Sequence, residues 1–151
     1  MLPNLDRYKK DLDALLSRGG QLDLAMRLEC FPDQIENVIK KEFGDKAKEV
    51  LKALPSFSEA YQSWYSEAKV LIRQLLPDRL LDFVRHYEKP KPRTDITYES
   101  YRIEDYLQGL NLTRWDKTKV VGPDAAIPHF RQQLAIVKSV KARFDSSLFG
   151  Y

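Results

Sequence analysis

The sequence lacks most of the features that mark secreted, membrane-bound or disulfide-stabilised proteins. Its 151 residues include one cysteine, Cys30, which cannot form an internal disulfide, so we expect a reducing compartment. No run approaches the roughly 20 apolar residues that span a bilayer. The opening residues, MLPNLD, are neither basic nor continuously apolar, so we expect no signal peptide. We therefore predict a cytoplasmic protein that is not associated with a membrane.

The chain is also without the motifs of familiar enzymes and metalloproteins. It has no glycine-rich phosphate loop, no G-x-S-x-G turn, no H-E-x-x-H pair and no cysteine cluster. Cys30 stands among apolar neighbours, which is typical of a small buried hydrophobe. His129 follows Pro128 at an expected helix start, where a positive charge is disfavoured. Asp124 is the one residue near it in the sequence that could share a metal ion with it. We predict an uncharged His129, no metal site and no cofactor.

The composition is that of an ordinary folded domain. Hydrophobic residues make up 43% and charged residues 31% of the chain, which excludes a disordered protein. A chain of this length buries roughly two-thirds of the surface of its unfolded state, enough for one domain with a core. The net charge of +3 permits contact with nucleic acid without arguing for it.

Apolar residues at helical spacing predict a bundle of helices in the front half of the chain. Gly19-Gly20 is expected to end the first helix, Asp33 to cap the third, and Ser56 with Glu59 to form a capping box. That box would open the longest helix of this half, which we expect at the centre of the bundle. Short helices are marginal alone and must pack on one another. The predicted helices span 5–18, 22–30, 35–43, 47–54, 56–75 and 77–88.

The back half is expected to be less regular. Two prolines in Lys89–Arg93 predict a stiff, extended strut. A short helix over 103–110 follows, and 112–122 is predicted to be irregular, with Trp115 anchored in the core. The last helix is expected over about 125–148. Its apolar face comprises Phe130, Leu134, Val137, Phe144 and Leu148.

These elements predict an all-α fold in a single domain, 1–151. We expect a compact multi-helix bundle with a long C-terminal amphipathic helix and an irregular segment around residues 89–124. The parts of this domain are a front bundle (5–88), the strut (89–93) and a back part (94–151).

Arg79 and His86 are the sole arrangement that suggests catalysis. They are seven residues apart, two helical turns, so both are expected on one side. The spacing resembles the R-x4-6-H signature of HEPN-type ribonucleases, in which histidine acts on the 2′-hydroxyl or leaving group and arginine steadies phosphate charge. Those enzymes carry a polar residue after the arginine, where this chain has Leu80. We favour the alternative, an exposed arginine and a partly exposed histidine beside Tyr87.

Seven basic residues stand against two acidic ones between residues 111 and 143. With the tyrosines upstream and Trp115, they suggest a nucleic-acid interface. A solvated basic face is the interpretation that we favour, since no aromatic platform motif is present. The candidate nucleic-acid contacts are Arg114, Lys117, Lys119, Lys138, Lys141 and Arg143.

Two stretches, LLPDRLLDFVRHYEKPKPRTDITYESYRIEDYLQGL and FRQQLAIVKSVKARFDSSLF, resemble the N-terminal helical region of a family of uncharacterised bacterial proteins. The resemblance covers about 64–149. In longer members of that family a C-terminal HEPN-like part with an R-N-x-x-x-H motif follows, and this motif is absent here. The resemblance therefore implies an accessory half without the catalytic one, and it gives Arg79 and His86 no catalytic role.

We predict a non-enzymatic helical domain for protein interaction or regulation, associated with an HEPN-like ribonuclease module of the defence or toxin–antitoxin type. A protein partner, or a second copy in a homodimer, would dock on the C-terminal helix. Two alternatives stay open. One is a small HEPN-like ribonuclease, in which Arg79 and His86 of two chains form a composite site. The other is an RNA- or DNA-binding domain that uses the basic C-terminal face.

Overall fold

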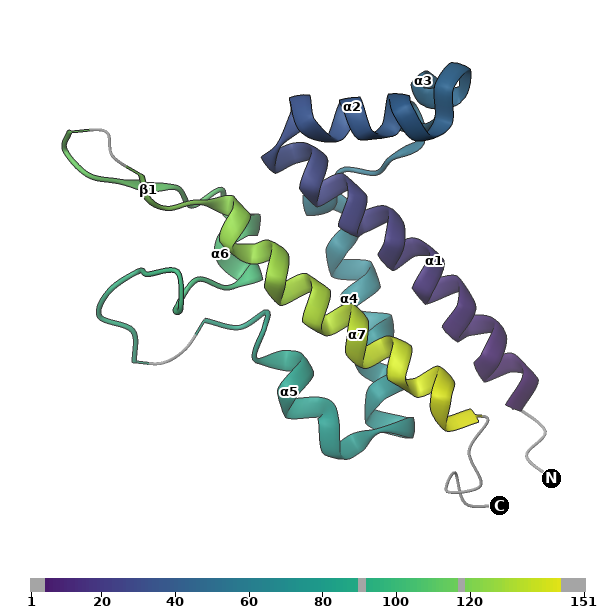
Figure 1. Cartoon of the computed structure of the whole chain (residues 1–151). Helices are drawn as coiled ribbons and strands as arrows, with labels where there is room; N and C mark the ends of the chain where they lie inside the picture. The colour runs from purple at the N-terminus through teal and green to yellow at the C-terminus, as the bar shows by residue number, and fades with distance from the viewer. Residues whose placement is uncertain (1–4, 90–91, 117–118, 145–151) are drawn as a thin grey trace.

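The computed structural model describes residues 5–89, 92–116 and 119–144, and it is an all-α bundle with one small hairpin (Figure 1). The α-helices are α1 (Leu5–Cys30), α2 (Pro32–Phe43), α3 (Ala47–Ala53), α4 (Phe57–Leu75), α5 (Leu80–Val84), α6 (Ile103–Leu107) and α7 (Ile127–Phe144). The strands are β1 (Leu112–Thr113) and β2 (Lys119–Val121). Short 3-10 turns are η1 (Gly44–Lys46), η2 (Pro77–Arg79) and η3 (Pro123–Ala126). The predicted fold class is confirmed.

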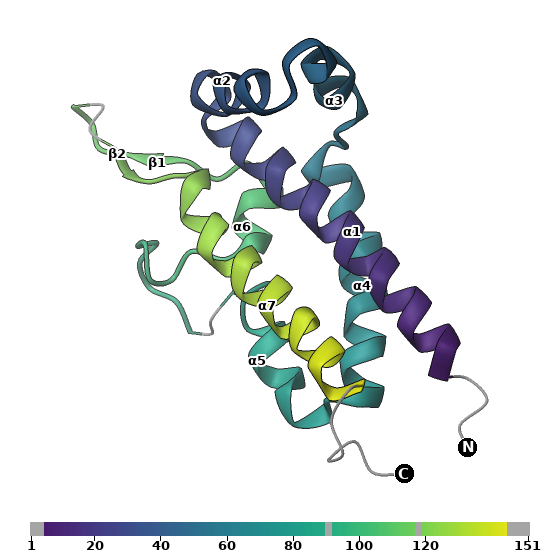
Figure 2. The ribbon, with the colours of Figure 1, turned by 45° about the vertical axis from the view of Figure 1, so that its right-hand side comes forward.

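Three long helices, α1, α4 and α7, form the body of the bundle, and α1 runs antiparallel to the other two (Figures 1 and 2). Helices α2 and α3 lie across one end of α1 and share a small cluster of their own around Ile35, Ile39 and Ala47. Helix α5 flanks α4 and α7, and the β1–β2 hairpin stands off the bundle near the start of α7. Among the described helices, none is both long and apolar enough to cross a membrane.

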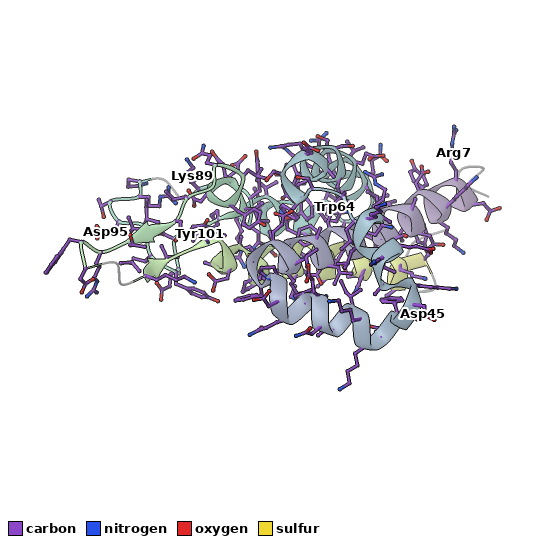
Figure 3. The ribbon with its side chains drawn as sticks, turned by 90° about the horizontal axis from the view of Figure 1, so that it is seen from above. Arg7, Asp45, Trp64, Lys89, Asp95 and Tyr101 are labelled. Carbon is purple, nitrogen blue, oxygen red and sulfur yellow. The ribbon has the colours of Figure 1, made fainter. Side chains whose placement is uncertain are left out.

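The main core is built around aromatic rings of α4. Trp64 lies in the middle of the helices (Figure 3), fully buried, and its Nε1 donates a hydrogen bond to the Leu15 carbonyl at 2.9 Å. The ring of Phe130 packs on it with centroids 5.0 Å apart. Tyr101 and Val137 belong to the same cluster. Residues of the front bundle and of the back part therefore share one core.

The apolar face of α7 is buried inside this bundle. Phe130, Leu134, Val137 and Phe144 are covered, and the helix contacts α1, α4 and α5. Leu148 lies outside the described residues. The face on which the predicted partner contact rested is thus occupied by this chain's own helices.

Gly19-Gly20 does not end a helix, and that prediction is wrong: α1 continues through both residues to Cys30. A Cβ on Gly19 would collide with Leu134 Cδ1 and lie 3.2 Å from Trp64 Nε1, whereas a Cβ on Gly20 would meet nothing within 4 Å. Gly19 therefore lets α1 approach α4 and α7 closely, and its role is in packing.

This difference predicts opposite effects for two adjacent substitutions. Gly20→Ala should raise the free energy of unfolding by about 0.5–1 kcal/mol, because alanine favours the helix. Gly19→Ala should lower it by about 1–3 kcal/mol, because Leu134 and Trp64 must shift in a packed core. Urea denaturation of both variants measures the difference. Stabilisation by both substitutions would contradict a packing role for Gly19.

Two predicted helix caps are also wrong. Ser56 occupies the N-cap of α4 but forms no side-chain cap bond, so it makes no capping box with Glu59. The carboxylate of Glu29, at the end of α1, instead accepts the first N–H of α4 at 3.0 Å. Phe31, not Asp33, is the N-cap of α2. Helix α4 is central as predicted, but α1 is longer.

The segment predicted to be irregular contains an antiparallel hairpin. Leu112 pairs with Val121 and Thr113 with Lys119. Trp115 is 97% exposed at the hairpin loop, so the prediction that it anchors in the core is wrong. In the hairpin, the side chain of Val121 is buried instead.

Candidate functional site

The two catalytic candidates, Arg79 and His86, are not brought together within the chain. Arg79 lies in η2, forms an exposed ion pair with Asp82 (Nε–Oδ2 3.1 Å), and borders a hollow with Arg143 near the end of α7. His86 follows α5 and contacts His129 in the first turn of α7. Because α7 has 18 residues, the two sites lie against opposite ends of that helix. A composite site with a second chain stays a prediction.

His86 and His129 form a pair that sequence reasoning missed. Their Nδ1 atoms are 2.9 Å apart, and their ring centroids are 5.2 Å apart. Both rings are half-buried. At this distance one Nδ1 donates a proton and the other accepts it, so the contact requires that at least one ring is neutral.

Arginine side chains flank the histidine pair. Nη1 of Arg102 lies 3.4 Å from Nε2 of His129. The same guanidinium donates to the carbonyl of Arg85 at 2.9 Å and to that of Glu99 at 2.6 Å, which fixes its position. Arg85 itself is exposed and precedes His86 directly in the chain.

The pKa of His86 is lowered to about 4, mainly by burial and with smaller contributions from positive charge on His129, Arg85 and Arg102. The pKa of His129 is also lowered to about 4. Burial is the largest cause, and the positive charge of Arg102 is the second. Both histidines are therefore uncharged at pH 7. The prediction of a neutral His129 is confirmed, and burial is its leading cause.

Gln133 ties this end of α7 to the core. It is fully buried, accepts a hydrogen bond from the Tyr61 hydroxyl at 2.7 Å and donates one to the Phe83 carbonyl at 3.0 Å. It lies one turn after His129. Buried hydrogen bonds thus hold the first half of α7 to α4 and α5.

The hairpin loop presents Trp115, the most exposed large hydrophobic side chain of the described residues. Besides Trp115, the hairpin exposes Val120 and Arg114, and Lys119 is held by Asp124. Figures 1 and 2 show the hairpin projecting away from the helices. The hairpin therefore presents exposed apolar side chains away from the helices.

The candidate nucleic-acid residues do not gather on one face. Arg114 and Lys119 belong to the hairpin near the start of α7, while the other described members lie toward its far end. Lys141 pairs with Asp13 at 3.6 Å, and Lys119 pairs with Asp124. The candidates toward the far end of α7 are Lys138, Lys141 and Arg143. Lys117 falls outside the described residues.

Tyr101 and Tyr106 are not available for stacking on bases. Both side chains are buried. The Tyr101 hydroxyl donates to the Leu110 carbonyl at 2.7 Å, and the Tyr106 hydroxyl donates to Glu29. Tyr98, another tyrosine upstream of Trp115, is exposed.

A cavity of about 460 Å³ lies at the base of the hairpin. Its lining includes Cys30, Tyr106, Lys119 and Asp124. Burial raises the pKa of the Cys30 thiol to about 11, so the thiol is protonated at neutral pH and is a poor nucleophile. Among the described residues, no three histidine, cysteine or acidic side chains gather as a metal site.

Comparisons of the chain with protein-family models, with curated proteins and with solved structures found no match. The resemblance to the N-terminal region of HEPN-containing proteins stays a prediction.

Proposed function

We propose that this chain is a non-enzymatic protein-interaction domain that docks on a partner protein through the β1–β2 hairpin, with Trp115 as its anchor. The observation that carries the proposal is the 97% exposure of this indole ring on a loop that stands off the bundle. Tryptophan is among the residues that most often dominate the energy of protein interfaces. Burying the ring in a partner would remove about 150–250 Å² of its surface from water.

The chemistry of the hairpin favours a protein over a nucleic acid. Trp115 and Val120 expose apolar surface, and the charge of Lys119 is balanced by Asp124. Arg114, next to the ring, is exposed and positive. Asp116, on the other side of Trp115 in the sequence, is also exposed. The surface therefore suits a partner with an apolar pocket for the indole and a polar rim that carries both charges.

The partner contact proposed here replaces the α7 face of the sequence-based prediction. That face is buried, whereas the hairpin is accessible. A non-enzymatic role is supported by the separation of Arg79 from His86. Association with an HEPN-like ribonuclease is part of the proposal, and the coding sequence tests it. An R-N-x-x-x-H segment in frame after codon 151 or in an adjacent gene supports it, and absence of both counts against it.

Trp115→Ala is expected to weaken partner binding at least about 30-fold, because it removes the anchor of the interface. The partner is first identified by native mass spectrometry of the chain isolated gently from its host, and is then purified for titration. Leu81→Ala is the matched control, since Leu81 is 82% exposed on α5, and it should change affinity by less than about twofold. Both variants should unfold at the temperature of the unsubstituted chain.

Equal affinity of Trp115→Ala and the unsubstituted chain for the purified partner would contradict the proposal. Recovery of RNA in place of a protein, with binding that depends on Trp115 and falls steeply with salt, would instead favour the nucleic-acid alternative.

A further inference from the structure

A cluster of protonatable and cationic side chains lies where the end of α5 and the start of α6 meet the start of α7. It comprises His86, His129, Arg85 and Arg102. These residues come from three segments of the chain that folding brings together. The proposed docking by the hairpin makes no use of them.

The geometry of the cluster is fixed by contacts that leave it partly accessible. The two histidine Nδ1 atoms face each other at 2.9 Å, and Arg102 Nη1 is 3.4 Å from His129 Nε2. Hydrogen bonds from Arg102 to backbone carbonyls hold its guanidinium in place. Both imidazole rings are half-buried and Arg85 is exposed, so a small ion can reach them.

Positive charge exceeds negative charge around these groups. Arg85 lowers the pKa of both histidines and of Arg102. Three groups raise these pKa values. Asp82 raises the pKa of His86, and Asp105 raises that of Arg102. A backbone hydrogen bond with Tyr101 raises the pKa of His129. Asp105 is already bound to another arginine by a bidentate ion pair. An anion that sits against the cluster would relieve this repulsion.

We propose that His86, His129, Arg85 and Arg102 bind a tetrahedral oxyanion, namely phosphate or the phosphate group of a larger ligand. The exposed guanidinium of Arg85 can match two oxygens of such an ion, Arg102 adds positive charge, and a protonated histidine adds an N–H donor. Because the anion favours protonated rings, binding and proton uptake are linked. Affinity should therefore rise as the pH falls. The site is independent of the partner contact by Trp115.

Titration of the two histidine ring signals by NMR tests the site, since the chain has two histidines and their signals are easily assigned. Sulfate is the probe, because its charge stays constant across this pH range, and sodium chloride at equal ionic strength is the reference. Sulfate should raise the apparent pKa for entry of the first proton into the histidine pair by about one unit or more, since one ring must stay neutral to keep the Nδ1 contact. Arg85→Gln should remove most of that rise. Arg79→Gln, an exposed arginine of the same segment, should leave it unchanged.

Equal histidine titration in sulfate and chloride would overturn the proposal. Equal loss of the effect in Arg79→Gln and Arg85→Gln would also overturn it, because the effect would then be general screening. A second arm distinguishes the source of the anion. Tighter binding of inorganic phosphate than of a ribonucleoside monophosphate indicates the free ion, and the reverse order indicates a phosphate carried by a larger ligand.

Discussion

Asp105→Ala is expected to lower the free energy of unfolding by about 3–5 kcal/mol, because it removes the fully buried acceptor of the Arg93 ion pair and of the α6 cap. Asp105 is fully buried, and its carboxylate accepts hydrogen bonds from Arg93 at 2.7 and 3.1 Å. It also accepts the backbone N–H of Arg102 at 2.8 Å, which caps α6. The hydrogen bond to Asp105 raises the pKa of Arg93 above its ordinary value.

Urea denaturation measures this loss, and the exposed ion pair of Arg79 with Asp82 supplies the control. Asp82→Ala should change the free energy of unfolding by less than about 1 kcal/mol, because water screens that pair. Similar losses for Asp82→Ala and Asp105→Ala would show that burial does not distinguish the two pairs. The segment between α5 and α6 would then be held by other contacts.

Acid is expected to destabilise the fold through the histidine pair. Histidine has a pKa near 6.5 in the unfolded chain, whereas His86 and His129 have pKa values of about 4 in the folded chain. The unfolded state therefore takes up protons first as the pH falls. Stability is fully present above pH 6.5 and declines toward pH 4. Because both rings are half exposed, we expect a decline of about 2–3 kcal/mol, smaller than the unscreened value.

Carboxylates also titrate in acid, so the comparison needs a variant without the pair. The double variant His86→Asn plus His129→Asn should show a flatter decline between pH 6.5 and 4.5, measured by urea denaturation at each pH. Its curve subtracted from that of the unsubstituted chain isolates the contribution of the pair. Parallel curves for the two proteins would mean that the histidines are not protonated differently on unfolding.

Helical periodicity predicted the bundle well where one apolar face decides the structure. The wide faces of α4 and α7 are buried as their spacing indicates. Glycine was harder to interpret, because it serves two purposes. Gly44 has a positive φ of 54° and ends α2, whereas Gly19 allows close packing inside a continuous helix. A single sequence does not distinguish these uses, since the packing partners of Gly19 lie far along the chain.

The candidate sites were the least predictable part of the chain. Tryptophan is a residue type that is usually buried. The exposure of Trp115 follows from its place in the loop between two very short strands. His86 and His129 are 43 residues apart, and no local pattern connects them. Asp105 is buried, although aspartate is a residue type that usually lies on the surface. Each depends on contacts between distant segments, which periodicity does not report.

Fluorescence quenching of Trp115 in the complex tests the proposed docking most directly. The chain has two tryptophans, and Trp64 is fully buried, so acrylamide should quench Trp115 almost alone in the free protein. Trp115→Phe should abolish that quenching. Saturation with the purified partner is expected to protect the Trp115 indole from acrylamide and to shift its emission to shorter wavelength. Unchanged quenching in a complex shown to have formed would mean that the partner binds elsewhere, and the proposed role of the hairpin would be wrong.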